Sequence, residues 1–97
     1  QPRKVKPSVD DASVVKKREA LLHDASAALL NPDIDQLRKI KERITTMRRA
    51  GLERGGEWST ENIVFKDLRN LGTIDQITQK IRDMENEELS LEQQRTQ

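Results

Sequence analysis

Four stretches of the chain place apolar residues three and four positions apart, which puts their side chains on one face of an α-helix. The spacing is clearest at Leu37, Ile40 and Ile44 and again at Ile77 and Ile81. Such faces build a narrow aliphatic core, because the 97 residues include one Trp, one Phe and no Tyr. The sequence therefore predicts an all-α fold, a compact bundle of four or five helices with flexible termini.

Residues that start or stop helices divide the first half of the chain into two helices. The first is expected to start within residues 8–11, where acidic side chains suit the helix dipole, to fray up to Arg18 and to end near Leu30. Pro32 fits the first position of the next helix, because its missing N–H is not needed there. That second helix is expected to end near Gly51, ahead of a glycine-rich loop.

The second half of the chain carries signals for two more helices. Ser59 is predicted to cap the third helix, and Gly72 to end it in the left-handed conformation that glycine adopts at little cost. Thr73 and Gln76 have the spacing of a capping box, so we expect Thr73 to be the N-cap of the fourth helix. This helix is expected to end within residues 85–91.

The apolar faces of these helices define the predicted core. Its expected members are Leu21, Leu22, Leu37, Ile40, Ile44, Met47, Val64, Leu68, Ile77 and Ile81. We expect the bundle to span residues 9–91, between a flexible basic linker at residues 1–8 and a polar tail at residues 92–97. Because the chain starts with Gln and a proline-containing basic run, we expect it to be a segment of a longer protein.

The composition argues against several classes of function. Lys and Arg number 18 against 17 Asp and Glu, so the net charge of +1 provides no global field for nucleic acid. No stretch is apolar for the roughly 18 residues that a membrane span needs, so we expect no membrane partner. The absence of Cys fits the reducing interior of a cell, so we expect an intracellular location. With no Cys and a single His, His23, the chain lacks the usual ligands and nucleophiles. We therefore expect no enzyme activity, no metal and no cofactor.

The second predicted helix and the loop after it are strongly basic. Three interpretations are open: a hydrated helix face, a surface for an acidic partner, or contacts with nucleic-acid phosphates. Acidic residues in the same stretch, Asp35, Glu42 and Glu53, partly neutralise it. The basic residues are Arg38, Lys39, Lys41, Arg43, Arg48, Arg49 and Arg54.

Three segments resemble a known family in their residue pattern. They are Leu-Leu-His-Asp-Ala-Ser-Ala-Ala-Leu-Leu-Asn-Pro-Asp-Ile-Asp-Gln-Leu-Arg-Lys-Ile at 21–40, Val-Phe-Lys-Asp-Leu-Arg-Asn at 64–70 and Thr-Ile-Asp-Gln-Ile at 73–77. Together they resemble the N-terminal domain of transcription elongation factor TFIIS and the related integrase-binding domain of lens epithelium-derived growth factor. The resemblance implies a right-handed bundle of four or five helices that binds short disordered motifs of transcription partners without catalysis. The glycine-rich loop at 52–57 is longer than in that family.

The sequence thus predicts a non-catalytic docking domain, a scaffold module of a larger intracellular and nuclear protein. Its expected ligands are short acidic-aromatic peptide motifs of transcription or chromatin partners, which bind in an apolar cleft where two turns meet at one end of the bundle. The resemblance points to the turn after the first helix and to the third helix, and the basic run adds two arginines. The expected partner-binding residues are Leu30, Asn31, Asp33, Phe65, Arg69, Arg48 and Arg49.

Two alternatives to peptide docking are open. The chain could be a nucleic-acid-binding accessory domain that uses the basic face of the second helix. It could also be an oligomerisation element, in which the fourth helix pairs with a second copy through Leu91. Our expectation is a monomeric domain with weak or no affinity for nucleic acid.

Overall fold

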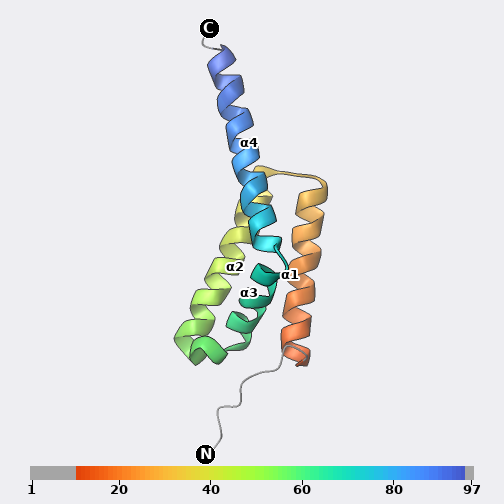
Figure 1. The fold of residues 1–97 in the computed structure, drawn as a ribbon, viewed down its shortest axis with the longest axis vertical. Helices are drawn as coiled ribbons and strands as arrows, with labels where there is room; N and C mark the ends of the chain where they lie inside the picture. Colours follow the sequence, from red (N-terminus) through yellow and green to blue (C-terminus); the bar gives the residue numbers. More distant parts are fainter. Residues whose placement is uncertain (1–10, 96–97) are drawn as a thin grey trace, which may run out of the picture.

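A computed structural model describes residues 11–95, and over this range the chain forms four α-helices and a short 3₁₀ turn with no strand (Figure 1). The elements are α1 (Ala12–Leu30), α2 (Ile34–Gly55), η1 (Gly56–Trp58), α3 (Thr60–Asn70) and α4 (Thr73–Arg95). The predicted all-α bundle is therefore confirmed, with four helices. The predicted linker at 1–8 and the last two residues of the predicted tail lie outside the described residues.

The helices are arranged around an antiparallel pair. α1 and α2 run side by side in opposite directions, and α3 packs against both of them (Figure 1). α4 starts in the middle of the bundle, passes along α2 and continues beyond the turn that joins α1 to α2 (Figure 1). That turn and η1 lie at opposite ends of α2, which has 22 residues and is therefore about 33 Å long.

The core gathers the apolar faces of all four helices. Every predicted core residue is buried except Leu22 and Met47, which are partly buried at the edge. The predicted set lacked Val14 and Ile63, which lie in the first turns of their helices, and two alanines. The buried core consists of Val14, Leu21, Ala25, Ala28, Leu37, Ile40, Ile44, Ile63, Val64, Leu68, Ile77 and Ile81.

The start of α1 is packed rather than frayed. Val14 is 0% exposed. Two ion pairs join the following turn to α3, from Lys17 Nζ to Glu61 Oε1 at 3.1 Å and from Arg18 Nη1 to Asp67 Oδ2 at 2.6 Å. The expectation of fraying is therefore wrong, because these contacts with α3 outweigh the modest helix propensity of the Ser and Val residues there.

Asp33 fixes the start of α2. Its Oδ1 accepts hydrogen bonds from the backbone N–H groups of Asp35, at 2.8 Å, and Gln36, at 3.3 Å. A carboxylate in this position satisfies two N–H groups that have no partner within the helix. α2 therefore begins at Ile34, and the start predicted at Pro32 is wrong by two residues.

Gly51 lies inside α2 rather than at its end. The helix continues to Gly55, so the end predicted at Gly51 is wrong. A Cβ at Gly51 would lie 2.6 Å from Glu61 Cβ and 2.8 Å from Ser59 Oγ, which is closer than van der Waals contact allows. Gly51 therefore allows the start of α3 to approach α2 closely.

The two ends of α3 follow the predicted signals. Ser59 Oγ accepts a hydrogen bond from the N–H of Asn62 at 3.1 Å, which confirms Ser59 as the cap. Gly72 has a φ of 82°, in the left-handed region. Its carbonyl accepts from the N–H of Gln76 at 3.0 Å, so α4 starts at Thr73. Thr73 is thus the first helical residue of α4 and not, as predicted, its N-cap.

α4 extends well beyond the bundle. It reaches Arg95, whereas the sequence predicted an end within 85–91 and a tail from 92. Every described residue after Met84 is exposed. This stretch is rich in Glu, Gln and Leu, which favour helix without tertiary contacts. We call residues 85–95 the α4 extension.

Candidate functional site

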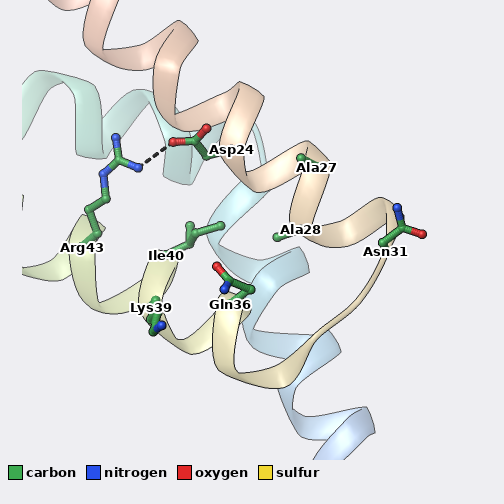
Figure 2. Close-up of a pocket in the computed structure, with 8 residues that line it drawn as sticks. All are labelled: Asp24, Ala27, Ala28, Asn31, Gln36, Lys39, Ile40 and Arg43. Atoms are coloured by element: carbon green, nitrogen blue, oxygen red, sulfur yellow. Dashed lines mark hydrogen bonds and ion pairs between the residues drawn. The ribbon is translucent and has the colours of Figure 1, made fainter.

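α1 and α2 leave a hollow between them beside the turn that joins them (Figure 2). Its volume is about 420 Å³. Ala27, Ala28 and Ile40 provide its apolar surface, and the short alanine side chains leave space between the helices. The residues around the hollow are Asp24, Ala27, Ala28, Asn31, Gln36, Lys39, Ile40 and Arg43.

A second hollow, also of about 420 Å³, lies along α1 and α2 toward the start of α1. Its lining residues are Lys16, Lys17, Ala20, Leu21, Arg43 and Met47. Arg43 borders both hollows, so they adjoin each other along the helix pair. We call the two hollows together the α1–α2 groove.

An ion pair between Arg43 and Asp24 crosses this groove (Figure 2). Nη1 of Arg43 lies 2.6 Å from Oδ2 of Asp24, and the two side chains are 53% and 41% exposed. The hydrogen bond from Arg43, followed by a contact with His23 at 3.3 Å, holds the pKa of Asp24 below its ordinary value. Asp24 is therefore ionised at neutral pH and holds Arg43 across the groove.

The rim of the groove is positively charged. Four cations line it, and Asp24 is the one carboxylate among the lining residues. Lys17 and Arg43 are engaged in ion pairs, whereas Lys16 and Lys39 form none within residues 11–95. An apolar surface bordered by unpaired cations suits a ligand that is both apolar and acidic.

Three of the residues predicted to bind a partner lie at the α1–α2 turn, with different surroundings. Asn31 lines the groove. Leu30 is 79% exposed and borders another hollow, which is lined by α1 alone and meets the groove at Ala27. The carboxylate of Asp33 is engaged as the cap of α2. Of these three predicted residues, Asn31 is therefore the one that lines the groove.

The other predicted residues lie elsewhere on the bundle. Arg48 stacks on Phe65, with its Cζ 4.3 Å from the ring centroid, in a cation–π contact between α2 and α3. Arg49 and Arg69 are exposed. Arg48 lies about 22 Å along α2 from Asp33, as judged from the helical rise per residue. The structure thus places the predicted site in two separate regions, because the turns expected to meet at one end lie at opposite ends of α2 (Figure 1).

A third, basic hollow of about 350 Å³ lies between α2 and α4. Arg38, Lys41 and Arg49 border it, with Ile81 beneath. Arg38 Nη2 is 3.3 Å from Oε2 of Glu85, so the first residue of the α4 extension neutralises part of this surface.

Lys16 and Asp24 were not predicted to belong to any site, and Lys39 and Arg43 were predicted only as members of the basic run. Cations on a helix face look the same in a sequence whether they border open solvent or a groove. One signal was nevertheless present. If two helices form an antiparallel pair, residues before the turn lie opposite residues after it, as Asp24 and Arg43 do.

Comparisons of the chain with protein-family models, with curated proteins and with solved structures found no significant match. Within residues 11–95, no helix has the length and apolar character needed to cross a bilayer. The same residues contain no group of three or more His, Asp or Glu side chains placed to hold a metal ion. The shape and charge of the α1–α2 groove are therefore the features that point to a function.

Proposed function

We propose that this chain is a non-catalytic docking domain that binds a short acidic peptide segment of another protein in the α1–α2 groove. The observation that carries the proposal is an apolar groove whose rim holds two lysines without ion pairs among the described residues, Lys16 and Lys39. Aromatic or aliphatic side chains of the peptide would enter the hollows, and its carboxylates would meet the lysines.

The surroundings of His23 support the non-catalytic part of the proposal. His23 is the one imidazole in the chain, and its side chain is 83% exposed. Ser26 lies one helical turn away, but within residues 11–95 no hydrogen bond joins its hydroxyl to His23. A serine nucleophile needs such a bond to a base, and His23 instead contacts Asp24 at 3.3 Å.

We also propose that the partners are transcription or chromatin proteins and that the domain acts as a monomeric scaffold module in the nucleus. This part rests on the resemblance of residues 21–40 to TFIIS N-terminal domains. The resemblance implies that the turn at Asn31 binds the partner, and Asn31 lines the α1–α2 groove.

A titration monitored by amide chemical shifts tests the proposal. An acidic-aromatic peptide should shift the amides of Ala27 and Ile40 in the groove. Lys39→Glu should weaken binding, because it removes an unpaired cation and adds a like charge to the rim. Lys41→Glu is the matched control, since Lys41 lies on the same helix but outside the groove. Equal weakening by both substitutions, or shifts confined to residues outside the groove, would contradict the proposal.

The basic hollow between α2 and α4 favours nucleic-acid binding as a second candidate function. Arg38, Lys41 and Arg49 provide cations for phosphate contacts there. We expect weak duplex binding that the double substitution Lys41→Glu and Arg49→Glu in this hollow abolishes, together with its salt dependence. A sub-micromolar, sequence-selective complex at physiological salt would place this function ahead of peptide docking.

The α4 extension has exposed leucines through which the chain could pair with a second copy. Leu89 and Leu91 are 56% and 51% exposed, so either could meet a second copy. A mass that doubles with concentration in light scattering, and that Leu91→Ala returns to the monomer value, would support pairing through α4. A constant mass would support the proposed monomer.

A further inference from the structure

We infer that the α1–α2 groove recognises an amphipathic helix of another protein. Two apolar residues of that helix, seven positions apart, fill the two hollows. An acidic residue between them takes the place of Asp24 in the ion pair with Arg43. The inference rests on the proposed function, because it specifies the ligand of the same groove. It assigns Arg43 as the residue that selects the ligand and Asp24 as its internal competitor.

The spacing of the hollows predicts the spacing of the ligand's apolar residues. On α1, Ala20 borders one hollow and Ala27 the other, seven residues later. On α2, Met47 and Ile40 are also seven residues apart, and they too border different hollows. Seven residues rise about 10 Å along an α-helix and complete nearly two turns. A helix lying along the groove would therefore direct its side chains i and i+7 into the two hollows.

A helical ligand also suits the chemistry of the groove. Its backbone groups are hydrogen-bonded within the helix, so they need no partners from the protein. Each hollow has three apolar side chains at its surface, which are Ala27, Ala28 and Ile40 in one and Ala20, Leu21 and Met47 in the other. An extended peptide would bring unpaired backbone groups against these surfaces, at a cost in free energy.

Arg43 lies where the acidic residue of such a ligand would arrive. It borders both hollows, so a ligand carboxylate at i+3 or i+4 would face it between the two apolar residues. The contact is accessible, since Arg43 is 53% exposed and Asp24 41% exposed. Asp24 contacts Nη1 of Arg43 at 2.6 Å, and a guanidinium favours a carboxylate in this position. An entering carboxylate must therefore compete with Asp24. Lys16 and Lys39, one at each hollow, would attract further acidic side chains.

The chain's own α4 has a similar spacing but does not suit the groove. Met84 and Leu91 are seven residues apart, with Glu87 and Glu88 between them. Met84 packs against the core of its own bundle, so α4 of a second copy cannot present both apolar residues. Of the two sources, α4 of a second copy and another protein, the groove suits a helix of another protein.

The test uses a designed helical peptide of about 15 residues, with Leu at two positions seven apart and Glu at the third and fourth positions between them. Affinity is measured by calorimetry and the binding surface by amide shifts. Asp24→Asn keeps the shape of the side chain but removes its charge, so Arg43 loses its competitor. We expect this variant to bind the peptide about two- to fivefold more tightly than the wild type, the range typical of one exposed ion pair. Arg43→Gln should weaken binding.

Two controls isolate the role of Arg43. In the Arg43→Gln background, Asp24→Asn should give a much smaller gain in affinity, because only the repulsion between Asp24 and the ligand carboxylate is removed and no guanidinium is released. A peptide with Gln in place of Glu should bind both Asp24 forms equally. Thermal melts of each variant show whether a change in affinity reflects a change in folding.

The outcomes separate this inference from the proposed function. If the wild type binds the peptide but Asp24→Asn binds it no more tightly, or if moving one Leu by two positions leaves the affinity unchanged, the inference is overturned and acidic-peptide docking stands. If neither this peptide nor an extended acidic-aromatic peptide shifts the amides of the groove, the proposed function fails as well.

Discussion

The packed start of α1 predicts a substantial loss of stability for Val14→Ala. The substitution removes two methyl groups from a side chain that is 0% exposed. At about 0.8 kcal/mol for each buried methylene-sized group, the lost transfer free energy is about 1.6 kcal/mol. The cavity left behind brings the loss to about 2 to 3 kcal/mol. The higher helix propensity of Ala returns roughly 0.5 kcal/mol, so the free energy of unfolding should fall by about 2 kcal/mol.

Val15→Ala is the matched control, because the adjacent Val15 undergoes the same chemical change with the same gain in propensity. Val15 is only partly buried, so we expect a loss below about 1 kcal/mol. Urea denaturation followed by far-UV circular dichroism gives both values, and each 1 kcal/mol should lower Tm by about 4–8 °C. Equal losses, or a change at Val14 within about 0.5 kcal/mol of zero, would show that the first turn of α1 is not packed and would refute the reasoning.

Three further predictions test the core, a cap and a pKa. Ile77→Ala, at a side chain that is 0% exposed, should cost about 2–5 kcal/mol in urea denaturation. Leu89→Ala, at a side chain 56% exposed, should change stability by less than about 0.5 kcal/mol, and similar losses at both would contradict the assigned core. Asp33→Ala removes the cap of α2 and should cost about 1 kcal/mol in the same assay, so an unchanged denaturation midpoint would rule out a stabilising cap. Burial alone would raise the pKa of Glu61, but its backbone hydrogen bond and Lys17 lower it more, so the folded pKa lies below 4.5. Ionised Glu61 stabilises the folded state at pH values above its pKa in the unfolded chain, and this stabilisation is lost as pH falls through its pKa in the folded protein. Glu61→Gln should therefore lower Tm at neutral pH, and should lower it by progressively less below about pH 4.5. A Tm difference that stays constant down to acid pH would contradict this account.

The helices and most of the core could be predicted because the apolar period and the local start and stop signals act over a few residues. Ser59 and Gly72 illustrate this, since each role depends on its own backbone position. The predictions were wrong where the role of a residue depends on contacts with a segment distant in sequence. Gly51 has the sequence signature of a helix end, but its role is to allow contact with Glu61 on another helix. Val14 was missing from the predicted core because the contacts that bury it are not visible in its local sequence.

The candidate site was less predictable than the fold. Asn31 was identified through a family resemblance, and it lines the groove. Lys39 and Arg43 were recognised as part of a basic run, but their relation to a hollow depends on the small side chains of α1 opposite them. The ion pair of Arg43 with Asp24 joins residues 19 positions apart, so it depends on how the two helices align. The groove forms only where the two helices pack side by side, so it cannot be predicted from the sequence of either helix alone.

The unbroken course of α4 gives its extension a defined direction as well as a defined length. No turn separates Met84 from Arg95, so the eleven residues of the extension, 85–95, form a continuous helical arm about 16 Å long. Each residue also rotates the helix by about 100°. Removing one residue from the arm would shorten it by only about 1.5 Å but would swing a label at Arg95 to a different side of the axis. Removing seven residues, nearly two turns, would almost restore the original side. The number of residues in the arm therefore sets the angular phase of its tip relative to the groove.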